Sequence, residues 1–195
     1  MSNIFFIRHA ETDMAGRFCG HSDPDLNVCG HKQTAELIDR LRPENIGSVY
    51  TSDLRRARTT AEAIAGAFGI ECRVRRDLRE INFGEWEGLT WREIELRDEA
   101  YASRWMAEHP LLPAPEGEAF RDFERRILDE VAFLSARVGE RDIAVVTHAG
   151  VLRTVLCSLH RCSEEDAWRL TKSYCAVVRH AVAASPQLSF VEVRS

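Results

Sequence analysis

Residues 4–12 read Ile-Phe-Phe-Ile-Arg-His-Ala-Glu-Thr, and this stretch decides the fold. Residues 4–7 form a short, uninterrupted apolar run, which is typical of a strand buried on both faces of a sheet. The run ends abruptly at Arg8 and His9, whose side chains can bind anions and exchange protons. The sequence therefore predicts a buried strand that delivers two reactive side chains to one edge of a sheet.

Outside this stretch, short apolar runs alternate with segments of helical periodicity. Further strands are predicted over residues 46–51, 71–75, 143–147, 176–183 and 188–193. Helices are predicted over residues 31–41, 54–68, 91–106, 120–138 and 151–160. Ser52 and Asp53 give an N-cap signal for the second of these helices. Such alternation predicts an α/β fold, namely a three-layer α/β/α sandwich around a mostly parallel sheet. We expect a single domain over residues 1–195, with a small helical and loop cap over residues 91–120.

Side chains that can bind anions or exchange protons follow three of the predicted strands. Arg8 and His9 follow the first strand, Arg56 lies just beyond the second, and His148 follows a later one. In parallel sheets ligands bind at the carboxyl ends of the strands. We therefore expect these four side chains to meet in one pocket, with Glu80 nearby.

The overall charge excludes some classes of partner. The chain has 195 residues and a net charge of 26 − 31 = −5, so no cationic field is available to attract nucleic acid or an anionic membrane. The apolar run at residues 4–7 is too short for a signal peptide or a membrane span. We expect a cytoplasmic protein whose partner is a small molecule. The sequence leaves the oligomeric state open, a homodimer included.

The cysteines raise the question of a metal site. Cys19 and His21 share a C-x-H spacing with Cys29 and His31, which together offer two sulfurs and two imidazoles. This spacing is unusual for zinc. We therefore interpret these residues as part of a loop and predict no metal and no cofactor.

The predicted pocket suits a dianionic phosphoryl group. The guanidiniums of Arg8 and Arg56 match phosphate oxygens in a planar fork, and His148 would add a third donor. The backbone amides of Ala149 and Gly150, at the start of a helix, would contribute further donors. Such a cluster would supply the charge stabilisation that Mg²⁺ provides in other phosphoryl-transfer sites.

Two further groups would make the pocket catalytic. A neutral imidazole at His9 is a competent nucleophile near pH 7. A protonated Glu80 could give its proton to the leaving alkoxide and later accept one from water. Taken singly, each residue is more commonly structural, and their joint position at strand ends is what predicts a two-step transfer through a phosphohistidine.

Four ordered motifs resemble the histidine phosphatase superfamily, also called phosphoglycerate-mutase-like. Residues 6–20 are similar to the family's R-H-G-E-T opening and its G-R-F-x-G loop. Residues 50–61 resemble its S-D-L-x-R-A-x-x-T-A motif, and residues 78–89 and 146–153 supply the third and fourth matches. The resemblance implies that His9 is the phosphorylated nucleophile and Glu80 the proton donor. The phosphate-pocket residues that it implies are Arg8, Arg56 and His148.

The chain departs from the family pattern at two positions. Ala10 stands where the family usually has Gly, and Ala15 stands where it often has an Asn that contacts phosphate. The loss of one neutral donor would weaken phosphate binding by ~1 kcal/mol and leave the chemistry in place.

Residues 83–88, Phe-Gly-Glu-Trp-Glu-Gly, resemble the phosphatase branch, whereas cofactor-dependent phosphoglycerate mutases carry E-R-H-Y-G there. The resemblance implies a metal-independent phosphomonoesterase that acts on a small phosphorylated metabolite. The chain resembles both the α-ribazole phosphatases, which act on α-ribazole 5′-phosphate, and the broad-specificity phosphatases. A phosphoglycerate mutase and a non-catalytic phosphate-binding module are the alternatives.

Substrate choice is predicted to depend on the cap. Trp91, Trp105 and Phe120 could face an apolar leaving group, and Glu116 or Glu118 could bond substrate hydroxyls. The alternative is that the aromatic residues pack the cap against the sheet.

Overall fold

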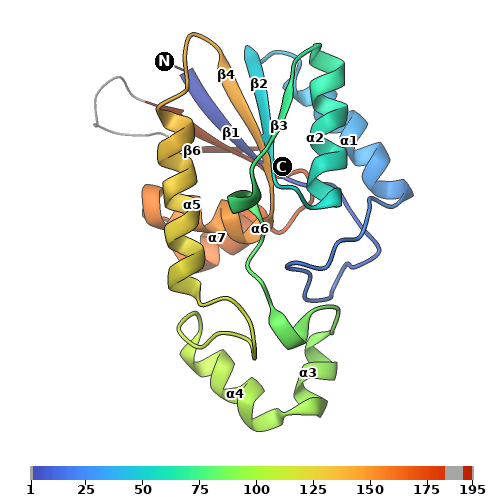
Figure 1. Ribbon diagram of the computed structural model, residues 1–195, viewed down its shortest axis with the longest axis vertical. Coiled ribbons are helices and arrows are strands. Elements are labelled where there is room, and N and C mark those ends of the chain that lie inside the picture. Colours follow the sequence, from blue (N-terminus) through green and yellow to red (C-terminus); the bar gives the residue numbers. More distant parts are fainter. Residues whose placement is uncertain (1, 183–190, 195) are drawn as a thin grey trace.

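The computed structural model describes residues 2–182 and 191–194, which contain a six-stranded sheet in the order β3-β2-β4-β1-β5-β6 (Figure 1). Four strands run parallel: β1 (Ser2–Arg8), β2 (Ile46–Thr51), β3 (Cys72–Val74) and β4 (Asp142–Thr147). Strand β5 (Val177–Val182) is antiparallel to β1, and β6 (Val191–Arg194) is antiparallel to β5. The mostly parallel sheet is thereby confirmed.

Strand β1 lies between β4 and β5 and is buried on both faces. Successive side chains of a strand point to opposite faces, so its apolar run feeds two cores. Ile4 and Phe6 pack into one core, and Phe5 and Ile7 pack into the other. An apolar run without alternation is what such a position requires.

Helices cover both faces of the sheet (Figure 1). One face carries α1 (Val28–Leu41) and α2 (Arg55–Phe68), whose buried side chains share a core with Phe5 and Ile7. The other carries α5 (Phe120–Ser135), α6 (Ala149–Thr154) and α7 (Glu164–Thr171). The three-layer α/β/α sandwich is confirmed. No helix in the described ranges is long and apolar enough to cross a membrane.

A separate group of elements lies beyond the carboxyl edge of the sheet, where Figure 1 shows α3 (Trp91–Arg97) and α4 (Glu99–Glu108). The single helix predicted over 91–106 is two helices because Asp98 leaves the helical conformation and its side chain accepts a hydrogen bond from Tyr101 N. This region has its own apolar core, formed by Trp86, Ile94, Ala102 and Ala114.

The predicted starts of two helices are corrected. The N-cap of α2 is Leu54, and Ser52 and Asp53 bond elsewhere. Helix α1 begins at Val28 and not at residue 31, so residues 28–30 are helical; the Asn27 side chain caps the helix by accepting a hydrogen bond from Gly30 N.

A further predicted helix is divided, and some elements of the structure were not predicted. The helix predicted over 151–160 is α6 followed by a π-helical turn, η3 (Val155–Leu159). Two 3₁₀ turns were not predicted, namely η1 (Arg76–Leu78) and η2 (Gly84–Trp86). Helix α7 was not predicted, although Ser163 caps it by accepting from Asp166 N. Residues 183 and 188–190 of the two predicted C-terminal strands lie outside the described residues.

Candidate active site

His9 follows β1 and is held from both sides of its ring. Its Nδ1 lies 2.7 Å from the Ala10 carbonyl oxygen, and its Nε2 lies 3.1 Å from Arg56 Nε. A carbonyl can only accept and a guanidinium can only donate, so Nδ1 carries the hydrogen and Nε2 carries the lone pair. The site therefore presents one defined nucleophilic nitrogen.

Arg56 is fully buried in the first turn of α2, where Nε faces His9. Its remaining nitrogens donate to backbone carbonyls of the loop before α1: Nη1 to Ser22 at 2.6 Å, and Nη2 to Cys19 at 3.1 Å and Gly20 at 2.8 Å. A buried guanidinium with every nitrogen bonded has one orientation. Arg56 thus fixes a positive charge directly beside the nucleophilic nitrogen.

Sequence reasoning missed Glu87, which holds that loop. Its carboxylate accepts from the backbone amides of Gly20, His21, Ser22 and Phe83 and from the Ser22 hydroxyl. Burial opposes ionisation, but these hydrogen bonds outweigh it and hold the pKa of Glu87 below its usual range. Glu87 lies in the Phe-Gly-Glu-Trp-Glu-Gly motif, but only the fold reveals its partners.

His148 follows β4 and is completely buried, with its ring centroid 5.2 Å from that of His9. Its Nε2 lies 3.0 Å from Ser52 Oγ. Its Nδ1 is buried and has no hydrogen-bond partner within residues 2–182 and 191–194. Ser52, predicted only as a helix cap, is therefore a positioning residue of the site.

Arg8 ends β1 and is anchored by the segment after α7. Its Nη1 donates to the carbonyl of Thr171 at 3.1 Å and to that of Lys172, and its guanidinium carbon lies 4.2 Å from the Tyr174 ring centroid. Its Nε is buried and finds no partner in the described part of the chain. Tyr174, 5.8 Å from the His9 ring, is a further neighbour that no local pattern announced.

Glu80 completes the group and is nearly buried. Its Oε2 accepts from Gly150 N at 2.9 Å and its Oε1 from Ile81 N at 3.0 Å. A Cβ atom at position 150 would come within 2.1 Å of Glu80 Oε1, so a larger residue there would displace the Glu80 carboxylate. The Gly150 amide, predicted to bind phosphate, instead positions Glu80; Ala149 is buried at the start of α6.

Arg126 of α5 secures the segment that carries Glu80. Its nitrogens donate to the carbonyls of Asp77, Arg79 and Glu80 at 2.7, 2.7 and 3.0 Å. The same guanidinium forms a bidentate pair with Glu118 at 2.7 and 2.8 Å. One side chain therefore ties Glu80 to the base of the cap, and Glu118 is committed to Arg126.

The electrostatics keep both imidazoles neutral. Burial, followed by the positive charges of Arg56 and Arg8, holds the pKa of His9 well below its ordinary value. Burial and the charge of Arg56 do the same to the pKa of His148. Burial also lowers the pKa of Arg8. His9 is therefore unprotonated near neutral pH and has its lone pair available.

The aromatic cap residues named from the sequence are in contact with other aromatic rings. Trp91 and Trp105 pack against Trp86 and Phe18, with ring centroids 5.2 to 6.4 Å apart. Phe120 packs against Phe123 at 6.2 Å, and Glu116 is exposed. These contacts favour the packing interpretation of the aromatic side chains.

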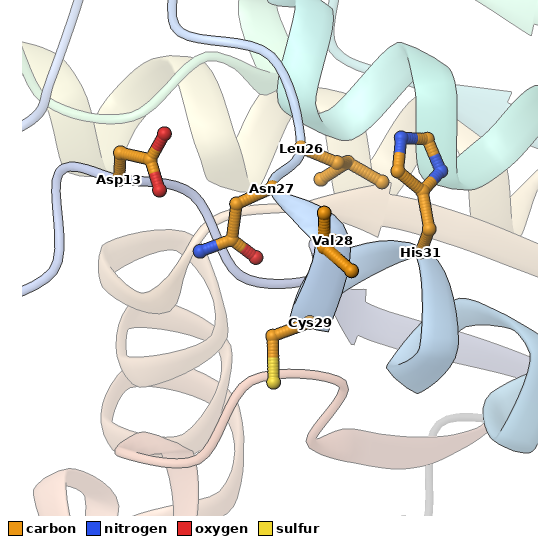
Figure 2. Close-up of a pocket in the computed structure, with 6 residues that line it drawn as sticks. All are labelled: Asp13, Leu26, Asn27, Val28, Cys29 and His31. Carbon is orange, nitrogen blue, oxygen red and sulfur yellow. The ribbon is translucent and has the colours of Figure 1, made fainter.

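A hollow of about 510 Å³ is separate from these residues (Figure 2). It lies at the first turn of α1, and Asp13, Asn27 and His31 are among the residues that line it. None of Arg8, His9, Arg56, Glu80 and His148 lines it. Cys29 and His31 lie here and Cys19 and His21 in the preceding loop; among the described residues no group of three or more His, Cys, Asp or Glu side chains could hold a metal ion.

These observations define an α/β enzyme in which two imidazoles, two guanidiniums and a carboxylate gather at the carboxyl edge of the sheet. Residues 4–187 match the family model described as histidine phosphatase superfamily (branch 1), and the chain belongs to this superfamily. The resemblance inferred from the four motifs is confirmed.

Individual relatives are phosphatases. A metal-independent phosphoserine phosphatase from Arabidopsis thaliana is 34% identical over 168 residues, which cover 84% of this chain and 71% of the relative. The adenosylcobalamin/alpha-ribazole phosphatase of Salmonella typhimurium is 29% identical, with 85% and 83% covered. The solved alpha-ribazole phosphatase from Shigella flexneri superposes with a TM-score of 0.86 at 25% identity, with 98% and 95% covered. The protein is accordingly a phosphoric monoester hydrolase.

Proposed function

We propose that this protein is a metal-independent phosphomonoesterase that works through a phosphohistidine at His9. One observation carries the proposal: the lone pair of His9 Nε2 faces Arg56 Nε at 3.1 Å while the Ala10 carbonyl holds the hydrogen on Nδ1. A nucleophile is thus oriented and unprotonated beside a cation that can bind the group it attacks.

In the first step Nε2 of His9 attacks phosphorus, the bond from phosphorus to the ester oxygen breaks, and the leaving alkoxide takes a proton from Glu80. In the second step a water attacks the phosphohistidine, gives its proton to the Glu80 carboxylate and releases inorganic phosphate with His9 restored. Arg8 and Arg56 would bind the phosphoryl oxygens and offset their charge, which supports chemistry without a metal ion.

His148 would respond to the substrate. Its pKa is low in the free protein because it is buried near Arg56. A dianionic phosphoryl group between the two imidazoles would offset that repulsion and favour the protonated form. Its buried Nδ1, which has no partner among the described residues, could then donate to a phosphoryl oxygen, with Ser52 holding the ring at Nε2.

The substrate is proposed to be a small phosphorylated metabolite, and the names of the relatives include phosphoserine and alpha-ribazole phosphatases. The proposed place of action is the cytosol, which the free thiol state of the six cysteines supports. A mutase is disfavoured because Ile81 and Phe83 stand where the E-R-H-Y-G motif of the mutases has its Arg and its Tyr.

The test is hydrolysis of p-nitrophenyl phosphate in EDTA, combined with intact-protein mass spectrometry after an alkaline quench. We expect turnover in the chelator and a mass increase of one phosphoryl group, which is absent in His9→Ala. A mutase would convert 3-phosphoglycerate primed with 2,3-bisphosphoglycerate, and a binding module would release no product. Turnover by His9→Ala would overturn the mechanism.

A further inference from the structure

Arg153, like Arg8, has guanidinium nitrogens without a partner among the described residues, which distinguishes both from Arg56 and Arg126. Arg56 and Arg126 are fully bonded to carbonyls, His9 or Glu118. Arg153 is half-buried on α6, and its Nε donates to Thr171 Oγ1 at 3.3 Å. Its two Nη atoms have no hydrogen bond or ion pair with any residue of the described ranges. A partly buried guanidinium with two open donors is poised to bind an anion.

Two contacts fix the direction of this guanidinium. The Arg153 guanidinium carbon lies 4.0 Å from the Trp168 ring centroid, and Thr171 Oγ1 holds the Nε end. The Thr171 hydroxyl is itself fixed, because it donates to Ala167 O at 2.7 Å. The side chain is therefore oriented before any ligand binds, which reduces the entropy lost on binding.

Arg153 lies next to the proposed catalytic groups. Thr171 bonds both arginines, Arg153 through its hydroxyl and Arg8 through its carbonyl. Arg153 is also one helical turn after Gly150, whose amide binds Glu80, and residues three apart share a helix face. The open donors are thus close to both the phosphate-binding arginine and the proton donor.

The charge of Arg153 reaches the cap as well. Burial lowers the pKa of His109, the negative charge of Glu164 opposes this, and the positive charge of Arg153 adds to the lowering. Burial likewise lowers the pKa of Arg153, which the negative charge of Glu80 partly offsets. Because Glu80 is the proposed proton donor to the leaving alkoxide, the alcohol half of a phosphate ester would lie on the Glu80 side of the phosphoryl group, and Arg153 is one helical turn from the Gly150 amide that binds Glu80.

We propose that Arg153 binds a carboxylate on the alcohol half of the substrate, so that the enzyme prefers phosphomonoesters of short hydroxy acids over those of neutral alcohols. This inference rests on the proposed phosphatase function. One guanidinium with two free nitrogens matches the two oxygens and single charge of a carboxylate. A second phosphate dianion would call for a further cation beside it.

The test compares two substrates that differ at one group: 3-phosphoglycerate, with a carboxylate, and sn-glycerol 3-phosphate, with a hydroxymethyl group in its place. The quantity measured is the ratio of their kcat/KM values. We expect wild type to favour 3-phosphoglycerate by about tenfold or more, since a charge-assisted bidentate pair is made only with the carboxylate. Arg153→Met should bring the ratio close to one.

Two variants separate recognition from structure. Arg153→Lys keeps the charge without the fork and should give an intermediate ratio. Arg169→Met removes an exposed arginine of α7 that pairs with Asp166, and it should keep the wild-type ratio. A merely structural role for Arg153 would lower both kcat/KM values together and leave the ratio unchanged.

The outcomes distinguish the two proposals. Turnover of both substrates with a ratio at or below one in wild type, or an unchanged ratio in Arg153→Met, overturns the role of Arg153 and leaves the phosphatase intact. Failure of wild type to hydrolyse either substrate or p-nitrophenyl phosphate overturns the proposed function and this inference with it.

Discussion

The carboxyl edge of the sheet and the cap beyond it are organised by different forces. At the edge, directional hydrogen bonds join segments far apart in sequence, such as Arg56 to His9 and Gly150 to Glu80. In the cap, aromatic rings pack edge to face, as Trp86 and Trp105 do at 5.2 Å. Directional bonds fix atoms in place, whereas ring packing mainly contributes buried area. Changes at the edge should therefore act on chemistry, and changes in the cap on stability.

The largest effect should come from removing the nucleophile. We expect His9→Ala to lower kcat for p-nitrophenyl phosphate by at least about 10⁴-fold, because the covalent step is lost. Its folding should be retained, since no apolar core residue is touched. His31→Ala, in the exposed first turn of α1, is the matched control and should keep wild-type turnover.

Glu80→Gln should produce the next largest effect and depend on the leaving group. We expect kcat to fall about 10²- to 10³-fold for an alkyl phosphate, whose alkoxide needs a proton, and far less for p-nitrophenyl phosphate. The exposed Glu116→Gln serves as control. An equal loss on both substrates would mean that Glu80 has a structural role alone.

Trp105→Ala tests the cap side of the comparison. Removing a partly buried indole from the aromatic cluster should lower the free energy of unfolding by about 2 kcal/mol. Denaturant unfolding gives this value, and kcat for p-nitrophenyl phosphate should change far less than in His9→Ala. A large loss of kcat with unchanged stability would show that the Trp105 indole contributes to catalysis, and it would contradict the expectation that changes in the cap act on stability.

The smallest effect is a pH dependence of stability that originates at the edge. His9 and His148 have folded-state pKa values well below the ordinary 6.5, so the unfolded chain takes up their protons first as the pH falls. Stability should therefore be fully present above pH 6.5 and decrease below it, by at most about 1.4 kcal/mol per histidine for each pH unit.

Thermal unfolding between pH 5 and 7.5 measures this dependence. The His9→Ala protein should lose less stability than wild type over the same range, because one of the two buried imidazoles is gone. Identical pH profiles for the two proteins would show that folding does not lower the pKa of His9.

The edge was predictable because its signals are local. Nine residues are enough to predict an apolar strand followed by Arg8 and His9. Because the carboxyl ends of parallel strands share one edge of a sheet, the side chains that follow other strands are expected there too. The positions of Ser52 and Tyr174 were not predictable, since each gains its role from partners across the fold. Ser52 even carried a competing local signal as a helix cap.

The cap was less predictable for a related reason. Aromatic residues at 91 and 105 fit both a binding surface and a packed core, and only the ring contacts distinguish them. The sequence likewise allowed Glu118 to bind substrate hydroxyls, whereas the structure pairs it with Arg126. The division at Asp98 also depends on a single side-chain bond to Tyr101.

The Ala10 carbonyl determines more than the direction of an imidazole ring. With the hydrogen retained at Nδ1 of His9, a phosphoryl group would be accepted at Nε2, which gives the tele isomer. Isomer-selective antibodies should therefore detect the trapped protein with the tele reagent and miss it with the pros reagent. A single backbone oxygen thus selects between two regioisomers of the modified side chain.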